Sequence, residues 1–175
     1  METSFAIFQE TEVPENELII SRTDLSGIIT YVNDTFAEIS GYDNDELIGQ
    51  SHNILRHPDM PHSVFKTLWD TIEAGNSWEG YVKNRRKDNG YYWVYANISG
   101  VYKDGKLVEY KSLRSFVPKA KRDEVQKVYD ELRQNEGDTV RTVTYLPADL
   151  YTSLKLEASD SGQSIDDLVI AKLSK

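Results

Sequence analysis

The chain has 175 residues and a formal net charge of -9, which argues against a protein that binds nucleic acid or anionic membrane through a general basic surface. It contains no cysteine, so disulfides, thiolate catalysis, iron–sulfur clusters and zinc–cysteine sites are excluded. The first twenty residues do not resemble a signal peptide and no apolar stretch approaches the length of a membrane span, so we expect a cytoplasmic protein.

Residues 18–117 predict one α+β domain built around an antiparallel sheet. Asp24 and Gly27 suit a tight turn between the first two strand-like runs, and Asn33 suits the N-cap of the helix that follows. The runs KDNG and KDGK are typical of hairpin turns, because Asn and Gly accept positive φ at low cost. In chain order we expect strands at 18–23 and 27–32, helices at 33–40, 43–49 and 61–75, and strands at 77–87, 90–102 and 106–116.

Three further segments flank this domain. Residues 1–17 form an N-terminal extension, and residues 118–137 predict an amphipathic connecting helix that ends at Gly137. The apolar face of this helix consists of Val125, Val128, Tyr129 and Leu132. Residues 138–175 predict a strand at 141–147 and two helices, a unit that is too small to bury a core alone. It needs a partner, most simply a second copy of the chain.

The stretch HNILRHPDMPH, residues 52–62, holds all three histidines of the chain. Their spacing of five and five does not place them on one helical face, and Pro58 and Pro61 interrupt a helix there. The residues alone leave a metal site, a catalytic centre and a rigid loop that holds another group as alternatives.

Other sequence patterns point away from an enzyme. We find no Ser-His-Asp order with a nucleophile elbow, no P-loop and no dinucleotide fingerprint, so we expect no catalytic residues. The spacing of the three histidines disfavours a metal site, so we also expect no bound metal. The basic run KNRRK, residues 83–87, is interpreted as a solvated strand end beside a hairpin.

The string TDLSGIITYVNDTFAEISGYDNDELIGQ, residues 23–50, resembles the N-terminal half of a PAS domain. That pattern is a D-x-x-G-x-I turn and strand, an N-x-x-F helix and a G-Y-x-x-x-E-L-I-G helix. The matching positions are Asp24, Gly27, Ile29, Asn33, Phe36, Gly41, Tyr42, Glu46, Leu47, Ile48 and Gly49. The resemblance implies a five-stranded antiparallel sheet with flanking helices.

The next segments narrow the resemblance. HNILRHPDMP, LWDTI, SWEGYVKNRRKDNGYYWVYAN, SLRS and the helix VQKVYDEL are similar to the FAD-binding PAS domains of aerotaxis receptors, over residues 18–136. This similarity implies a domain that holds FAD non-covalently and reports its redox state. Haem ligation by a histidine, another use of PAS domains, is the alternative. The lack of cysteine excludes the cysteinyl–flavin adduct of LOV-type light sensors.

The resemblance also implies which residues bind the cofactor. Four aromatic residues supply ring walls, Asn84 supplies an amide for the ring edge, and Arg56 with His57 supplies donors toward phosphate or ribose. The alternative for Asn84 is exposure to solvent. The full expected set is His52, Asn53, Arg56, His57, Asp59, Trp69, Trp78, Asn84, Tyr92, Trp93, Ser112 and Arg114.

The tail, residues 138–175, resembles a ribbon–helix–helix domain, in which two chains pair their strands into a ribbon that enters the DNA major groove. The match rests on Leu146, Pro147, Leu150, Leu154, Gly162, Ser164, Leu168 and Val169. Alternation along the strand points Arg141, Val143 and Tyr145 outward, which is a poor set for reading bases, and the acidic tail lacks phosphate attraction. The tail therefore favours dimerisation, with DNA binding as an alternative.

Three functions follow from these features. The first is a sensor that reports FAD redox state, or oxygen and energy status, to a signalling protein such as a chemoreceptor or kinase pathway, with residues 118–136 as a helical dimer. The second is a flavin-gated transcription regulator that uses the tail to bind DNA. The third is a cofactor-free PAS module that serves only in protein association.

Overall fold

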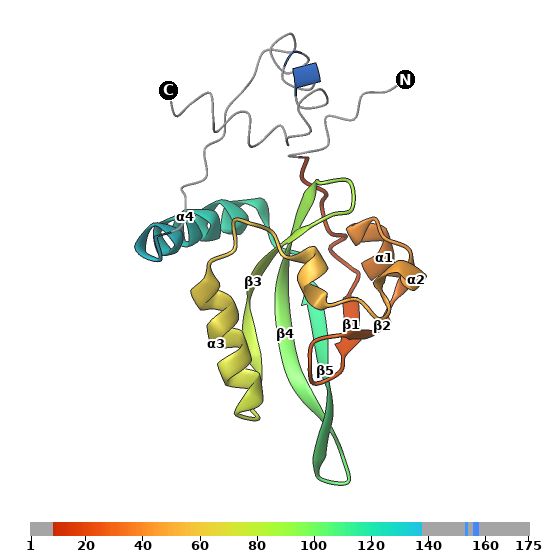
Figure 1. Ribbon diagram of the computed structural model, residues 1–175. Helices are drawn as coiled ribbons and strands as arrows, with labels where there is room; N and C mark the ends of the chain where they lie inside the picture. The colour runs from red at the N-terminus through yellow and green to blue at the C-terminus, as the bar shows by residue number, and fades with distance from the viewer. Residues whose placement is uncertain (1–8, 138–152, 154–155, 158–175) are drawn as a thin grey trace. The chain divides into compact units, whose positions relative to one another are not determined.

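The chain is described by a computed structural model that covers residues 9–137, 153, 156 and 157 (Figure 1). It divides into two compact units, residues 1–140 and 141–175. In the second unit the described residues, Ser153, Leu156 and Glu157, have helical backbone and are exposed. The predicted ribbon strand with Arg141, Val143 and Tyr145 lies outside the described residues.

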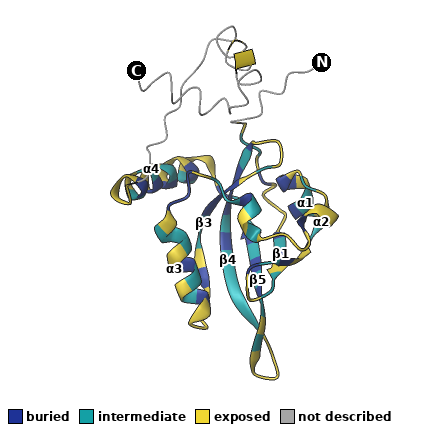
Figure 2. Cartoon of the chain, viewed as in Figure 1, coloured by how far each residue is buried: buried dark blue, intermediate teal, exposed yellow. Residues whose placement is uncertain are grey.

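One five-stranded antiparallel sheet forms the centre of the first unit, so the predicted α+β fold class is confirmed. Its strand order is β2-β1-β5-β4-β3. The strands are β1 (Ile19–Thr23), β2 (Ile29–Val32), β3 (Trp78–Arg85), β4 (Tyr91–Lys103) and β5 (Lys106–Ser115). The helices are α1 (Asp34–Ser40), α2 (Asn44–Leu47), the 3-10 helix η2 (His52–Leu55), α3 (His62–Glu73) and α4 (Lys119–Asn135). Figure 2 shows that buried residues follow β3, β4 and β5.

Local sequence signals account for where these elements begin and end. Asn33 caps α1, because its side-chain oxygen accepts hydrogen bonds from the amides of Phe36 and Ile20 and so ties the helix to β1. The two predicted hairpin turns contain residues with positive φ, Asn89 at 67° and Asp104 at 51°. These turns set the register in which β3, β4 and β5 pair.

The two faces of the sheet have different partners. Side chains alternate between faces along a strand, so Val82 and Asn84 of β3 share one face while Lys83 lies on the other. The Val82 and Asn84 face lines a cavity together with α3. On the Lys83 face, α4 packs over β3 and β4, with the Tyr129 hydroxyl donating to the Tyr81 carbonyl at 2.6 Å.

The connecting helix forms where the sequence predicts it, but its buried face differs from the prediction. Val125 and Tyr129 are buried and Leu132 packs against the core, whereas Val128 is 49% exposed. The remaining buried positions on α4 are two arginines, Arg122 and Arg133. Of the predicted apolar face, Val128 alone is exposed, and long arginine side chains occupy part of the interface with the domain.

No helix among the residues that the structure describes combines the length and the apolar character needed to cross a membrane. Those same residues contain no group of three or more histidine, aspartate or glutamate side chains arranged to hold a metal ion.

Candidate functional site

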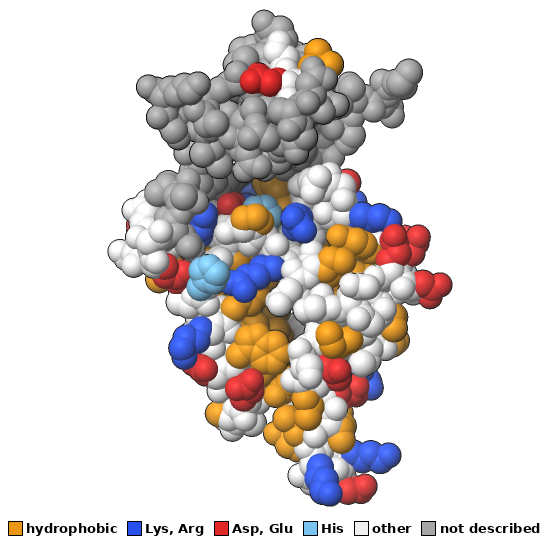
Figure 3. Space-filling model, in the orientation of Figure 1, with side chains coloured by type: hydrophobic (Ala, Val, Ile, Leu, Met, Phe, Trp, Pro, Cys, Tyr) orange, Lys and Arg blue, Asp and Glu red, His pale blue; other side chains and the backbone are white. Residues whose placement is uncertain are grey.

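A cavity lies between α3 and the inner face of the sheet. The space between its lining residues, including the open solvent at its mouth, amounts to about 730 Å³. Figure 3 shows hydrophobic side chains lining a hollow on this side of the molecule. Most of the wall is apolar or aromatic and consists of Phe65, Leu68, Trp69, Ile72, Val82, Ala96, Ile98 and Tyr110.

Trp69 forms one wall of the cavity from α3. Its ring meets Tyr110 edge-on, with 6.0 Å between centroids and 84° between planes. The indole also lies against Gly27, where a Cβ atom would come within 3.3 Å of it. Gly27 has a φ of 82°, a conformation that side chains rarely adopt, so the backbone favours glycine there, and the close indole adds a smaller steric reason.

Two polar side chains from different strands reach the cavity without satisfying their hydrogen bonds. The Nδ2 atom of Asn84 and the Oγ atom of Ser112 are buried, and neither has a hydrogen-bond partner among the described residues. Native proteins rarely leave such atoms unpaired, because each costs about 1–3 kcal/mol. The two atoms are therefore available to a polar partner inside the cavity.

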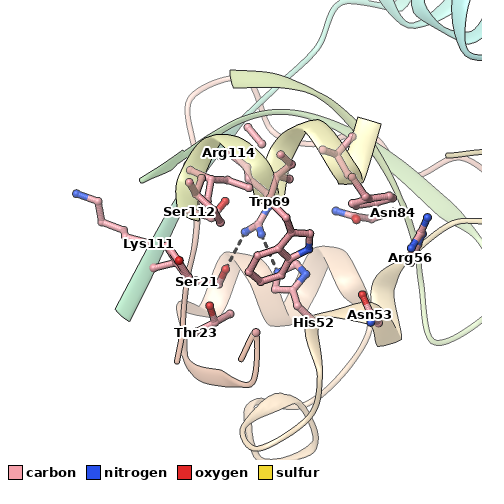
Figure 4. Close-up of a pocket in the computed structure, with 18 residues that line it drawn as sticks. Ser21, Thr23, His52, Asn53, Arg56, Trp69, Asn84, Lys111, Ser112 and Arg114 are labelled. Carbon is pink, nitrogen blue, oxygen red and sulfur yellow. Dashed lines mark hydrogen bonds between the residues drawn. The ribbon is translucent and has the colours of Figure 1, made fainter. Parts of the chain in front are cut away.

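Arg114 adds a buried positive charge beside these groups. It donates to the Ser21 Oγ at 3.0 Å and to the His52 Nε2 at 2.7 Å (Figure 4), and its guanidinium lies over the Phe36 ring at 5.3 Å. Within the described part of the chain, no carboxylate lies within ion-pair distance of it. A buried cation without a counter-charge favours a ligand that offers carbonyl oxygens or negative charge.

Burial and this charge determine the protonation states around Arg114. Burial, together with the positive charge of Arg114, lowers the pKa of His52 to about 3, so His52 is neutral and accepts the hydrogen bond. Burial lowers the pKa of Arg114 to about 10, which keeps it charged at neutral pH. Burial raises the pKa of the Tyr92 hydroxyl to about 12, although the nearby Arg114 and Asn84 limit the rise.

At the mouth of the cavity, Arg56 is held over the ring of Phe65 with 4.1 Å from its guanidinium carbon to the ring centroid. Its Nη2 atom lies 3.1 Å from the Nδ1 atom of His62. The backbone of Arg56 also forms an isolated bridge with Asn84, which places the loop that carries it against the end of β3. Asn53 completes this rim.

The structure brings seven of the twelve expected site residues together around the cavity. These are His52, Asn53, Arg56, Trp69, Asn84, Ser112 and Arg114. The sequence reasoning did not name other lining residues, among them Ser21, Thr23, Phe65 and Tyr110. The pairing of β1 with β5 is the signal that identifies Ser21 as a lining residue. Ser21 lies directly opposite Ser112 in this pairing, so both side chains lie on the cavity face.

The other five expected residues do not line the cavity, and each has other neighbours. Trp93 lies on the opposite face, with its ring centroid 6.0 Å from that of Tyr129. Trp78 shares the cavity face, but its ring packs on Gly80, and Tyr92 is fully buried. The two loop residues, His57 and Asp59, contact Tyr91 and Lys83 respectively.

The interpretation of the basic run as a solvated strand end holds for Arg85 and Lys87, which are exposed, but is wrong for Lys83 and Arg86. Lys83 is 1% exposed and binds Asp59. Arg86 donates to the carbonyls of Ile39 and Glu38 at the end of α1, and Lys87 pairs with Glu46 at 2.6 Å. The run therefore fastens α1 and α2 to the sheet.

Comparisons with known proteins agree with this architecture. Residues 29–114 match the family described as PAS fold. The chain is 41% identical over 135 residues to the aerotaxis receptor of Escherichia coli K12, which covers 77% of the chain and 26% of the receptor. It is 30% identical over 105 residues to the nitrogen fixation regulatory protein of Klebsiella pneumoniae, covering 59% and 21%. The chain thus spans about a quarter or less of these relatives.

Among solved structures, the light state of the blue-light photoreceptor Aureochrome1 LOV is similar with a TM-score of 0.56. The match is 22% identical and covers 67% of this chain and 91% of that chain. At this identity the likeness concerns the fold, and it agrees with the five-stranded sheet and flanking helices.

Proposed function

The chain carries a PAS domain, and on that premise we propose that it is a non-enzymatic signal-transduction sensor that holds FAD non-covalently in the cavity between α3 and the sheet. The observation that carries the proposal is the apolar cavity with two unpaired polar atoms, on Asn84 and Ser112, beside the buried cation of Arg114. A flat ring with a polar edge fits this combination.

The residues of the cavity match the chemistry of a flavin. The isoalloxazine ring is flat and aromatic, and its pyrimidine edge carries carbonyl acceptors and one N–H donor. The amide of Asn84 and the hydroxyl of Ser112 would bind that edge, and the indole of Trp69 would cover the ring. The unpaired atoms would then be satisfied by the ligand, which removes the cost of their burial.

The cavity mouth favours a dinucleotide over a shorter flavin. Arg56 is the cation at this mouth, and its position over Phe65 holds it close to solvent. Arginine binds phosphate oxygens in a bidentate manner, so Arg56 would hold the pyrophosphate of FAD. His57, which the sequence reasoning paired with Arg56 in this role, packs against Tyr91 instead.

The bound flavin supplies reversible electron transfer. The chain's own residues exclude water from the ring, orient its polar edge, and hold a positive charge beside it in Arg114. Because His52 is neutral over the physiological range, the charge at this end of the cavity does not change with pH near neutrality. Such a site is suited to sensing redox state, and through it oxygen or energy status.

The relatives support a signalling role with a protein partner. The E. coli relative is an aerotaxis receptor and the Klebsiella relative is a nitrogen fixation regulatory protein, and both match the PAS part of this chain. We propose that residues 118–136 carry the change as a helical dimer to a partner protein. The alternative output is DNA binding through residues 138–175. It stays a prediction, because the described residues of that segment, Ser153, Leu156 and Glu157, do not test it.

The visible absorption spectrum of the purified chain tests the cofactor assignment. We expect flavin bands, release of the yellow colour on denaturation, and identification of the released compound as FAD by chromatography. A colourless protein that binds no flavin after refolding with excess FAD would contradict the proposal. Release of a shorter flavin would contradict the role of Arg56.

A further inference from the structure

The hairpin formed by β4 and β5 extends beyond the rest of the sheet. β3 pairs with β4 only as far as Ile98, and β1 pairs with β5 only as far as Tyr110. We call residues 99–109 the finger. It is a two-stranded ribbon whose outer edges have no neighbouring strand, and Figure 1 shows it projecting from one end of the domain.

Contacts around Gly100 hold the finger in a defined shape. A Cβ atom at this position would lie 2.6 Å from the Leu107 Cδ1 and 3.1 Å from the Tyr102 Cε2, so these two side chains close over the glycine. The register of β4 and β5 also shifts next to Tyr102, and such a bulge increases the local twist of the ribbon. The finger therefore presents its side chains from an ordered ribbon.

Large apolar side chains are exposed at this end of the domain. On the finger, Tyr102 is 53% exposed and Val108 is 44% exposed. Leu25, at 49%, lies in the turn after β1, and the pairing of Thr23 with Tyr110 places that turn beside the base of the finger. Single exposed apolar side chains are ordinary, whereas several that gather in one place mark an interaction site.

The tip of the finger adds positive charge to these apolar side chains. Lys103 and Lys106 are exposed, and Asp104 is the acid between them. Further along the finger, Glu109 pairs with Arg22 at 2.9 Å, so its charge is compensated. Figure 3 shows hydrophobic side chains on the finger and basic ones at its tip. The tip is thus locally cationic on a chain whose formal net charge is -9.

The other end of the domain is acidic. Figure 1 shows α1 and α2 away from the finger, and these helices and the turn between them carry exposed carboxylates. They belong to Asp34, Glu38, Asp43 and Asp45. Attraction between exposed charges is largely screened beyond about 8 Å at physiological ionic strength, so the nearest charges outweigh the net charge. An anionic surface therefore attracts the finger and repels the α1 and α2 end.

The shape and composition of the finger favour a membrane surface over a protein as its partner. A two-stranded ribbon is too narrow to supply the roughly 800 Å² that a stable protein interface buries on each side. Lysine is also depleted at the centre of protein interfaces. At a membrane, by contrast, tyrosine rings sit at the level of the headgroups, and lysines are attracted to anionic lipids.

We propose that the finger docks the domain reversibly on an anionic lipid surface. Tyr102 and Val108 enter the headgroup layer, and Lys103 and Lys106 contact the lipid phosphates. Docking brings the cavity close to the surface, because Tyr110 at the base of the finger lines that cavity. The docking uses no residue assigned to the flavin, so it does not rest on the proposed function.

Co-sedimentation of the full chain with vesicles tests the docking. At low salt the chain should partition onto vesicles made of equal parts phosphatidylglycerol and phosphatidylcholine but not onto phosphatidylcholine alone, and added salt should release it. The double variant Lys103→Glu, Lys106→Glu should lower the partition coefficient at least about tenfold, because it replaces two attractive charges by repulsive ones. Tyr102→Ser should lower it several-fold.

Two matched controls separate the finger from general effects. The double variant Lys66→Glu, Lys119→Glu changes the net charge by the same amount at exposed positions on α3 and α4. Tyr31→Ser removes a tyrosine of similar exposure from β2. Both controls should bind the anionic vesicles as the wild type does.

Three results would overturn the proposal. The first is a wild-type chain that does not partition onto the anionic vesicles. The second is an equal loss of binding in the finger variants and in the controls. The third is self-association without lipid, measured by sedimentation velocity, that the finger variants abolish, because the finger would then serve contact between copies of the chain.

Discussion

Lys83 and Asn84 are consecutive residues of β3 that serve opposite faces of the sheet: Lys83 binds Asp59 beneath α4, and Asn84 faces the cavity. The peptide between them thus joins the two regions that a sensor must connect, the ligand site and the helix that leads out of the domain. Because the two residues share one peptide bond, a displacement of β3 at this position moves the side chains on both faces of the sheet together.

The amide of Asn84 should be a main determinant of flavin affinity. In Asn84→Ala the dissociation constant for FAD should rise by about tenfold or more, since loss of a buried hydrogen bond costs roughly 1–3 kcal/mol. Quenching of FAD fluorescence on titration measures this constant. Asn97→Ala, on the opposite face of β4 where Asn97 donates to Glu79, is the control and should bind FAD as the wild type does. Equal affinity in both variants would refute the assigned role of Asn84.

Gly27 should matter to the cavity as well as to the backbone. Gly27→Ala and Gly49→Ala should each lower the free energy of unfolding by about 1–2 kcal/mol, because φ is 82° and 84° at these positions. A Cβ atom at Gly27 would also press on Trp69, whereas nothing lies within 4 Å of a Cβ atom at Gly49. Only Gly27→Ala should weaken FAD binding, as measured by titration beside urea unfolding. Weaker binding in both variants would mean that backbone strain alone is responsible.

Arg114 should raise the reduction potential of the bound flavin, because a buried cation stabilises the electron-rich reduced form. Arg114→Gln should lower the midpoint potential by about 30 mV or more, equivalent to about 1.4 kcal/mol for a two-electron couple. Spectroelectrochemical titration measures the potential. Arg22→Gln, which removes a partly exposed arginine paired with Glu109, is the control. Identical potentials in all three proteins would contradict the role of Arg114.

His52 should make the stability of the domain depend on pH. The unfolded chain protonates this histidine below about pH 6.5, whereas the folded chain does so only near pH 3, because burial lowers its pKa. The free energy of unfolding should therefore be highest above pH 6.5 and fall between these limits, with a contribution of at most about 1.4 kcal/mol per pH unit. Urea unfolding across this window should show a shallower slope in His52→Gln. An unchanged slope would show that His52 has the same pKa in the folded and the unfolded chain, against the burial described here.

The sequence alone predicts the elements and their order well, because hairpin turns such as KDNG and caps such as Asn33 are local signals. It predicts less well which side chains of the sheet border the cavity and which lie beneath α4. Alternation along β4 places Tyr92 and Trp93 on opposite faces of the sheet, but the sequence does not show which of these faces borders the cavity. The burial of Lys83 and Arg133 depends on Asp59, which is distant in sequence from both, so only the folded chain reveals it.

The most direct test of the account is a crystal structure of the chain refolded with FAD. We predict density for the flavin ring between Trp69 and the sheet, with ring-edge atoms within about 3.2 Å of the Asn84 amide and the Ser112 hydroxyl. A structure in which these two groups stay unpaired, or in which FAD binds elsewhere, would contradict the assignment of this cavity as the flavin site.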